Sequence, residues 1–162
     1  MKKKLWISVL ILVITIVGVY SFVKSNPPLE IGTLASSEDK KSVVVGIGNK
    51  RFREVKILDV LVNNNEKPSN TKIQVSNALQ GFIITDNYNN GESKKYGFKN
   101  IGEVTVKIGT SPSSNYKKSD DGTASEKDAI YGISVINNES INQVHIKYSY
   151  LGISFNDTVI FN

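Results

Sequence analysis

The sequence predicts a mainly β protein, an antiparallel β-sandwich of immunoglobulin-like architecture preceded by one N-terminal transmembrane helix. Two observations predict this fold class. Leu5–Val23 is an uncharged apolar run, and after Ser25 short runs of β-branched and aromatic residues recur between Gly, Asn, Asp and Pro turn signals. About seven to nine such strands, with no uninterrupted helical pattern, suit a sandwich. Because the chain has no cysteine, the Cys, Trp, Cys spacing of antibody domains is absent and the likeness is one of architecture alone.

The apolar run Leu5–Val23 is long enough to cross a membrane. As a helix it reaches about 28 Å, close to the thickness of the hydrocarbon layer. Lys2–Lys4 precede it and only Lys24 follows, which favours a cytoplasmic N-terminus and an exported C-terminal part. We therefore expect a single-pass protein of the cell membrane with three parts: a cytoplasmic basic tip and transmembrane anchor (1–24), a tether (25–41) and an extracellular β-sandwich domain (42–162).

The same N-terminal segment also fits a cleaved signal peptide, which would release the domain as a secreted protein. The sites with small residues, Val19-Tyr20-Ser21 and Val23-Lys24-Ser25, are not of the Ala-x-Ala type, and the apolar run is longer than the usual signal-peptide core. The uncleaved anchor is therefore the preferred interpretation. Pro27-Pro28 ends the helix, which argues against a pilin-like subunit whose helix continues into a stalk.

Composition narrows the compartment and the partners. The formal net charge is +5, but Lys2–Lys4 supply three of the positive charges, which leaves about +2 on the exported part. The basic balance therefore does not predict nucleic-acid binding. Without cysteine the domain has no disulfide framework, no thiolate metal site and no lipid-attachment residue. Together with a composition rich in Lys, Ile and Asn, this leads us to expect a Gram-positive bacterial surface.

The first two thirds of the exported part contain six expected strands. Val55–Val62 is apolar at nearly every position, which predicts burial on much of both faces. Glu103–Ile108 alternates, which places Val104, Val106 and Ile108 on an inner face. The other expected strands are an edge strand within the tether at Glu30–Ala35, and the runs Val43–Ile47, Lys72–Ser76 and Gly81–Thr85.

The last third gives the strongest strand signal. Tyr131, Ile133 and Val135 share one face, and a second alternation follows in Val144, Ile146, Tyr148 and Tyr150, against His145, Lys147 and Ser149. The parity of the apolar positions changes at Leu151-Gly152, which predicts a bulge or a tight turn at that point. Asn156-Asp157 predicts a further turn before a final strand with Val159 and Phe161.

Motifs for catalysis are weak. His145 is the only histidine, and on the polar side of a strand it is expected to face solvent. Ser114-Asn115-Tyr116-Lys117 has the serine-x-x-lysine spacing of penicillin-recognising enzymes, but the other two motifs of those enzymes and their helical half are missing. Gly46-Ile47-Gly48-Asn49-Lys50 lacks the strand-to-helix context of a phosphate loop, so a turn is expected there. No cofactor is predicted.

The polar segment Thr110–Asp128 is long enough to be either functional or disordered. It holds the densest acidic cluster of the chain, and hard cations such as Ca²⁺ bind several carboxylate oxygens. The spacing does not fit a helix-loop-helix calcium loop, because Lys117 would occupy its first ligand position. The cluster is a weak candidate for a loose metal site and otherwise a solvated loop; its members are Asp120, Asp121, Glu126 and Asp128.

Two other sets of residues are candidates for binding. Lys50, Arg51 and Arg53 surround Phe52 and could meet anionic wall polymers or lipid headgroups, although a solvated strand end explains them as well. The second set consists of tyrosines in polar loops, a composition that binding loops favour and that half-buried lids also show; its members are Tyr88, Tyr96 and Tyr116.

The sequence favours a non-catalytic binding module at the cell surface, with a surface protein, a peptide or a cell-wall glycan as its partner and the loops Asp86–Tyr96 and Thr110–Asp128 as its binding surface. The membrane is a partner through the N-terminal helix. Two alternatives remain open. One is a hydrolytic enzyme that uses the carboxylates of Thr110–Asp128, since paired carboxylates suffice for glycoside chemistry. The other is an accessory subunit of a membrane complex.

Overall fold

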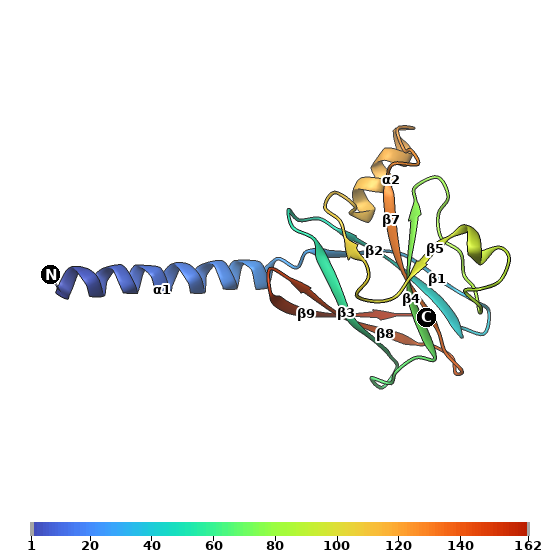
Figure 1. The fold of residues 1–162 in the computed structure, drawn as a ribbon, viewed down its shortest axis with the longest axis horizontal. Coiled ribbons are helices and arrows are strands. Elements are labelled where there is room, and N and C mark those ends of the chain that lie inside the picture. The colour runs from blue at the N-terminus through green and yellow to red at the C-terminus, as the bar shows by residue number, and fades with distance from the viewer. Residues whose placement is uncertain (1, 162) are drawn as a thin grey trace.

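A computed structural model describes residues 2–161, in which a long N-terminal helix projects from a body of two β-sheets (Figure 1). The sheets have the strand orders β1-β2-β7-β4-β5 and β6-β3-β8-β9, and all strand pairs are antiparallel. The elements are α1 (Lys2–Ser25), β1 (Leu29–Ser36), β2 (Ser42–Asn49), β3 (Val55–Val62), β4 (Asn70–Asn77), η1 (Ser93–Lys95), β5 (Gly97–Lys99), β6 (Thr105–Val106), α2 (Pro112–Asp120), β7 (Ala129–Ile136), β8 (Gln143–Tyr150) and β9 (Ile153–Ile160).

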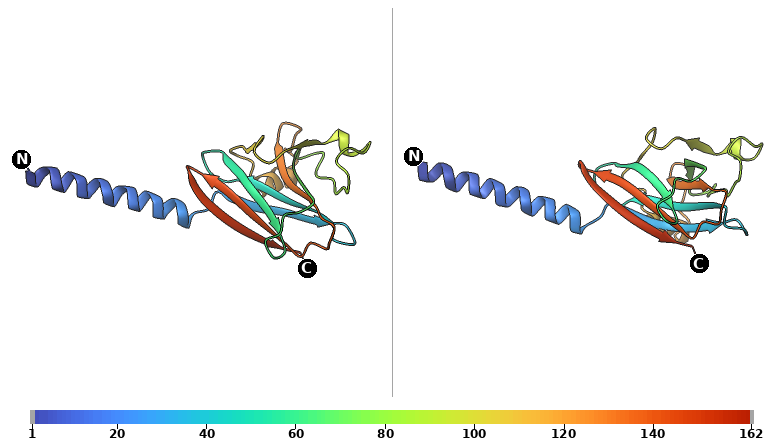
Figure 2. Two further views of the ribbon diagram at one scale, coloured as in Figure 1. Left: turned by 60° about the horizontal axis from the view of Figure 1, so that its bottom comes forward. Right: turned by 90° about the horizontal axis from the view of Figure 1, so that it is seen from below.

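The two sheets lie face to face (Figure 2). Between them lies one apolar core. Two antiparallel sheets in a sandwich-like arrangement, preceded by an N-terminal apolar helix, confirm the prediction of a mainly β sandwich. The alternating residues of β7 and β8 point into this core and are 3% exposed or less: Tyr131, Ile133, Val135, Val144, Ile146, Tyr148 and Tyr150.

The apolar positions change parity after β8 because the chain makes a tight turn there, which is one of the two predicted alternatives. Leu151 (φ 52°) and Gly152 (φ 76°) both have left-handed backbone conformations, and Tyr150 pairs directly with Ile153 across the turn. The predicted turn at Asn156-Asp157 is wrong, because β9 runs through it without a break. As β9 is an edge strand, its polar residues can face solvent, and Asp157 accepts a hydrogen bond of 3.1 Å from the Tyr148 hydroxyl.

Three other strand predictions need correction. Of the strand predicted at Glu103–Ile108, only Thr105 and Val106 form a strand, β6. Ile108 is 57% exposed, because Gly102 and Gly109 adopt positive φ and turn the chain away from the sheet. Gly81–Thr85 forms no strand. In β3 the predicted burial on both faces is wrong, since Lys56 and Leu58 are exposed on the face opposite the core.

The segment expected to be a tether, 25–41, holds a complete strand. The expected edge strand at Glu30–Ala35 is confirmed as β1, which pairs with β2 from Leu29 onward. Only Asn26, Pro27 and Pro28 therefore separate α1 from the sandwich.

The outer face of the five-stranded sheet is covered as well. Residues 78–96, which we call the cover segment, and α2 lie across this face (Figure 1). Val44 and Ser134, which alternate with core residues and so point outward, are each 1% exposed. This outer layer was not predicted, and it contains a helix where the sequence indicated a loop or disorder.

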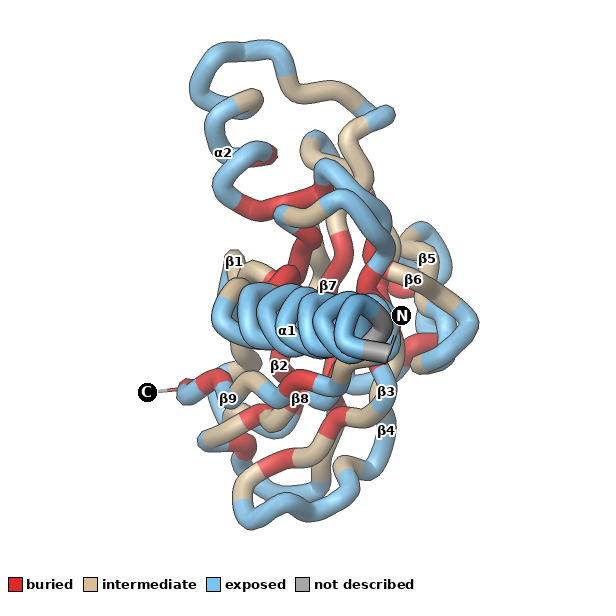
Figure 3. Tube along the Cα trace, turned by 90° about the vertical axis from the view of Figure 1, so that its left-hand side faces the viewer, coloured by how far each residue is buried: buried red, intermediate tan, exposed pale blue. Residues whose placement is uncertain are grey.

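In contrast to the sandwich, helix α1 buries almost none of its apolar surface. Figure 3 shows it exposed along its length, and Leu12 and Ile14, for example, are 60% and 62% exposed. By length and composition Trp6–Ser25 could cross a membrane. Among the described side chains of α1, Val23 at the C-terminal end packs against the core of the sandwich.

Candidate functional site

Two neighbouring glycines create a flat area on the outer face of the five-stranded sheet. Gly46 of β2 and Gly132 of β7 are direct partners in the antiparallel ladder. The ring of Phe82, in the cover segment, lies against both: a Cβ atom at Gly132 would be 3.0 Å from ring atom Cε1, and one at Gly46 would be 3.2 Å from Cε2. The missing side chains therefore let the cover segment approach the sheet closely.

The buried side chain of Gln74 in β4 holds the cover segment at the next position along the sheet. With its amide oriented to satisfy both atoms, its oxygen accepts from the Ile83 N–H at 2.9 Å and its nitrogen donates to the Ile83 carbonyl at 3.2 Å. Gln74 has no exposed surface. One side chain thus provides the hydrogen bonds that a strand partner would give, which is why the β-prone run around Ile83 needs no sheet pairing.

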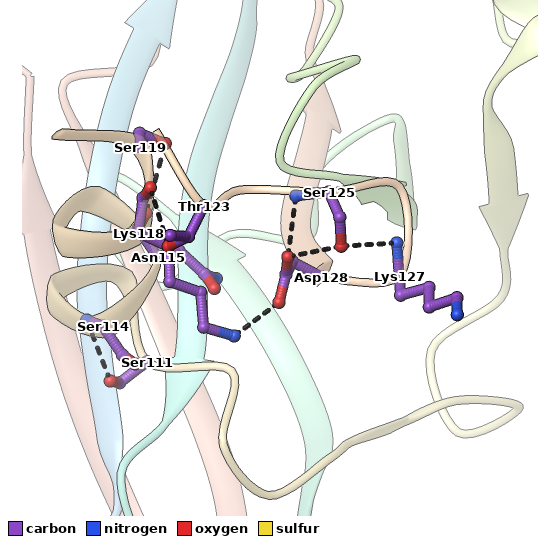
Figure 4. Close-up of polar contacts among 9 residues, drawn as sticks. All are labelled: Ser111, Ser114, Asn115, Lys118, Ser119, Thr123, Ser125, Lys127 and Asp128. Atoms are coloured by element: carbon purple, nitrogen blue, oxygen red, sulfur yellow. Dashed lines mark hydrogen bonds and ion pairs between the residues drawn. The ribbon is translucent and has the colours of Figure 1, made fainter. Parts of the chain in front are cut away.

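The opposite wall is helix α2, whose start the local sequence explains. Ser111 is the N-cap, with its Oγ accepting from the Ser114 N–H at 3.3 Å, and Pro112 occupies the first turn, where its lack of an N–H costs nothing (Figure 4). Pro112 lies on the backbone of β1 and β2: a Cβ at Gly32 would be 2.7 Å from its Cβ, and one at Gly48 would be 2.6 Å from its Cδ. The helix therefore requires glycine at both positions.

The space between the cover segment and α2 is a pocket of about 460 Å³. Its size lies in the usual range for small-ligand sites, about 300–1,000 Å³. Carbon atoms dominate its walls, and the rim reaches solvent, since Ile84 is 38% and Tyr116 49% exposed. The residues that form it include Gly46 and Ile130 at the floor, Phe82, Ile83 and Ile84 on one side, and Pro112, Asn115, Tyr116 and Ser119 on the other.

A few polar groups face this pocket. Asn115 is 7% exposed and its carbonyl accepts from the Ser119 hydroxyl at 3.2 Å, but its side-chain amide makes no hydrogen bond to any other described residue. The Tyr116 hydroxyl lies 2.8 Å from the hydroxyl of Thr33 in β1. The amide atoms of Asn115 are not among the fully buried side-chain atoms that lack a partner, so the amide stays accessible from the solvent side of the pocket. Asn115 is thus placed to bind a polar group of a ligand.

The C-terminal end of α2 is fixed by an ion pair. The Lys118 ammonium contacts the Asp128 carboxylate, which also accepts from the N–H and hydroxyl of Ser125, each at 2.8 Å (Figure 4). The hydrogen bond from Lys118, followed by those from Ser125, lowers the pKa of Asp128 to about 2. Thr123 donates from its N–H to the Lys118 carbonyl at 2.8 Å and closes the helix end.

The other acidic candidates do not form a site. Asp120, Asp121 and Glu126 are exposed, whereas Asp128 is bound to Lys118. Within residues 2–161 no group of three or more His, Cys, Asp or Glu side chains could hold a metal ion. Ser114 and Lys117 are exposed on α2, so the serine-x-x-lysine spacing does not face the pocket.

The three candidate tyrosines have three different environments. Tyr88 is 8% exposed and fixes the cover segment, Tyr96 is half-buried, and Tyr116 lies at the pocket rim. Of the two alternatives that the sequence left open for these tyrosines, Tyr88 resembles a lid, because its ring packs on Phe98 with centroids 4.7 Å apart. Burial raises the pKa of Tyr88 to about 12.

The basic candidates lie elsewhere, in the β2–β3 connection. Lys50 and Arg53 are exposed, whereas Arg51 is half-buried and donates to the Asn26 side chain at 3.2 Å. Gly46–Asn49 belongs to strand β2, so the turn expected at this glycine-containing run begins only at Lys50.

His145 is not simply solvent-facing. Its Nε2 donates to the Asn63 carbonyl at 2.7 Å and its Nδ1 accepts from the Thr158 hydroxyl at 2.9 Å, because a carbonyl oxygen can only accept. It therefore joins β8 to the β3–β4 connection and to β9, which gives it a structural role.

Sequence reasoning missed the residues that matter most here, namely Phe82, Asn115 and the glycines of the floor. The Ser111-Pro112 pair was the available signal for α2. Comparison of the chain with protein-family models, curated proteins and solved structures gave no match.

Proposed function

We propose that this protein is a membrane-anchored, non-catalytic binding module of the bacterial cell surface, and that the pocket between α2 and the cover segment binds an uncharged, mainly apolar group. The observation that carries the proposal is the pocket itself. Its volume of about 460 Å³ is that of a small-ligand site, it opens to solvent, and Asn115 is one of its lining residues.

The chemistry of the lining supports an uncharged ligand. Among the described residues that line the pocket, none is an Asp, Glu, His, Lys or Arg. A charged group would lose its hydration there without gaining a partner, which is unfavourable by several kcal/mol. An aliphatic or aromatic side chain with a neighbouring amide, as a peptide presents, would instead bury carbon on Phe82 and Ile84 and hydrogen-bond to Asn115. Such a ligand fits better than a glycan, whose many hydroxyls need many polar partners.

The same lining favours binding over hydrolysis. General acid–base catalysis needs a titratable side chain within hydrogen-bond reach of the substrate. The carboxylates that a hydrolase would use do not line the pocket; they are Asp120, Asp121, Glu126 and Asp128. Asp128 is already bound to Lys118 and Ser125.

Helix α1 supports the anchored topology. Its aliphatic side chains are exposed around the whole helix, and each large one gains about 1.5–3 kcal/mol when removed from water. A bilayer provides that environment. Lys2–Lys4 before the span and Lys24 after it favour a cytoplasmic N-terminus, so the sandwich is on the outer side.

The binding proposal is tested with methyl-labelled full-length protein in lipid nanodiscs, to which N-acetyl-leucinamide and N-acetyl-phenylalaninamide are added as probes. We expect methyl shifts at Ile83, Ile84 and Ile130, and none at Ile57 in the core. Ala35, which lines the pocket, is replaced in a blocking variant Ala35→Trp. The matched control is Asn138→Trp, at an exposed residue of the β7–β8 connection that does not line the pocket.

The shifts should disappear in Ala35→Trp and persist in Asn138→Trp. Shifts that survive the blocking variant, or that spread evenly over core and pocket methyls, would contradict the proposed site. Turnover of a peptide or glycoside substrate that depends on Asp120 or Glu126 would contradict the non-catalytic assignment.

A further inference from the structure

One end of the sandwich combines exposed apolar side chains with basic ones. Phe52 in the β2–β3 connection is 72% exposed, and Leu151 in the β8–β9 turn is 49% exposed. The two connections are neighbours, since the ring of Phe52 meets that of Tyr150 edge-on with centroids 6.1 Å apart. A phenyl ring that projects so far gains free energy when it leaves water, as it would on entering a membrane interface.

This end is also the one from which α1 leaves, as Figure 1 shows. Four contacts fix the helix end to it. Lys24 donates to the Ser154 carbonyl at 2.7 Å, and its ammonium lies 4.6 Å from the centroid of the Phe155 ring. Arg51 donates to the Asn26 side chain at 3.2 Å, and the Lys50 N–H donates to the Pro28 carbonyl at 3.1 Å.

The short connection limits how far this end can move from a bilayer that α1 spans. Asn26–Pro28 are the only residues between helix and strand, and three extended residues reach at most about 11 Å. That distance exceeds the headgroup region on one side of a bilayer, about 5–8 Å, by only a few ångströms. The contacts of Lys24 and Arg51 shorten it further.

The charge of this end suits an anionic surface. Lys24, Lys50, Arg53 and Lys107 are exposed and Arg51 is half-buried, whereas Glu54 is the acidic residue of the β2–β3 connection. Each basic side chain near an anionic membrane is attracted to it, and salt screens the attraction. Phe and Leu side chains of interfacial proteins insert at the boundary between headgroups and acyl chains.

We propose that this end of the sandwich is a membrane-docking surface, in which Phe52 and Leu151 enter the headgroup layer and Lys50 and Arg53 bind anionic phospholipid. The proposal rests on the proposed spanning role of α1 and assigns the domain a fixed, low position on the bilayer. Docking in this way leaves the distal turns of the sandwich directed away from the membrane.

The test uses the full chain, whose lack of cysteine allows a single label. Phe52→Cys carries the environment-sensitive fluorophore NBD in vesicles of phosphatidylcholine with or without phosphatidylglycerol, with nitroxide lipids as quenchers. The matched control is Asn64→Cys, an exposed site beyond the other end of β3. The eight residues of β3, which lie between the two labelled sites, span about 26 Å. We expect blue-shifted emission and several-fold stronger quenching at position 52, increased by phosphatidylglycerol.

A second variant, Lys50→Glu combined with Arg53→Glu, should abolish the dependence on phosphatidylglycerol. Flotation of the vesicles separates the two proposals. Protein that floats but shows equal, water-like emission at positions 52 and 64 would overturn the docking surface and leave the anchor intact. Protein that does not float would overturn the anchor and the docking surface together.

Discussion

The hydroxyl of Tyr88 donates a hydrogen bond of 2.8 Å to the carbonyl oxygen of Ser134, in the middle strand of the five-stranded sheet. It thereby fixes the cover segment to the outer face of the sheet, opposite the core. The pocket depends on this attachment, because one of its walls belongs to the cover segment.

Tyr88→Phe should lower the free energy of unfolding by about 1 kcal/mol, since one buried hydrogen bond is lost. The pKa of Tyr88 is raised from 10.0 to about 12 in the folded state, so its contribution to stability is complete below pH 10 and is lost as the pH rises towards 12. Urea titrations of full-length protein in detergent between neutral and alkaline pH would measure both effects.

The matched control for this variant is Tyr116→Phe, which removes a hydroxyl from an exposed ring. It should change stability by less than about 0.5 kcal/mol. Equal losses in the two variants would show that Tyr88 does not fix the cover segment.

The alternation of Val144, Ile146 and Tyr148 was sufficient to predict the core, because a strand with one buried face repeats every two residues. The run around Ile83 also looks like a strand, but its backbone groups are satisfied by the side chain of Gln74. Composition cannot reveal such a long-range partner. For the same reason, no pattern in the sequence indicates that Gly46 and Gly132 pair with each other and leave room for Phe82.

Gly48→Ala should destabilise the protein by about 3 kcal/mol or more and should distort the pocket. The new Cβ would lie 2.0 Å from the carbonyl oxygen of Thr110, and backbone atoms there cannot move aside as a flexible side chain can. The N-terminus of α2 would have to shift. Chemical unfolding gives the loss, and the methyl shifts of Ile83 and Ile84 report the distortion.

Gly91→Ala serves as the control, since nothing lies within 4 Å of its Cβ position and its φ is not positive. It should be neutral or slightly stabilising, by about 0.5 kcal/mol, because alanine restricts the unfolded chain. A Gly48→Ala protein as stable as the Gly91→Ala protein would contradict the close contact of β2 with the start of α2.

Helix α2 could not be predicted from the pattern of apolar residues. Its nine residues contain one proline, one tyrosine and otherwise polar side chains, so no apolar period predicts a helix. Contacts formed at its two ends hold it in place, at Ser111 and at the Lys118–Asp128 ion pair. The Ser111-Pro112 signal was present, but the remaining contacts depend on residues far along the chain.

Lys118→Met should raise the pKa of Asp128 from about 2 towards 3.8, although the hydrogen bonds from Ser125 keep it below that value. Because the folded-state pKa is lowered, the stabilisation by Asp128 is present above pH 3.8 and is lost as the pH falls to 2. Carboxyl carbon NMR of the full-length protein would measure the pKa directly. An unchanged pKa in Lys118→Met would show that the ion pair does not fix this end of α2.

Ile146→Asp should cost about 4 kcal/mol or more, since an ionised carboxylate would lie unpaired in the core, where Ile146 is 1% exposed. His145→Ala should cost about 1–2 kcal/mol through its hydrogen bonds to Asn63 and Thr158. Urea unfolding of both variants tests the register of β8. Equal effects would mean that neighbouring residues do not point to opposite faces.

Under the proposed topology, protease treatment of intact cells should remove the sandwich, because a charge bias such as that of Lys2–Lys4 over Lys24 favours export of the C-terminal part. Carbonate washing should leave the protein in the membrane fraction, since removal of Trp6–Ser25 from lipid would expose its aliphatic side chains to water. Lys2–Lys4→Glu with Lys24→Arg should reduce the exported fraction, whereas Lys24→Arg alone should leave it unchanged. Full-length protein that is protected in intact cells, or that appears free in the medium, would contradict the anchored topology.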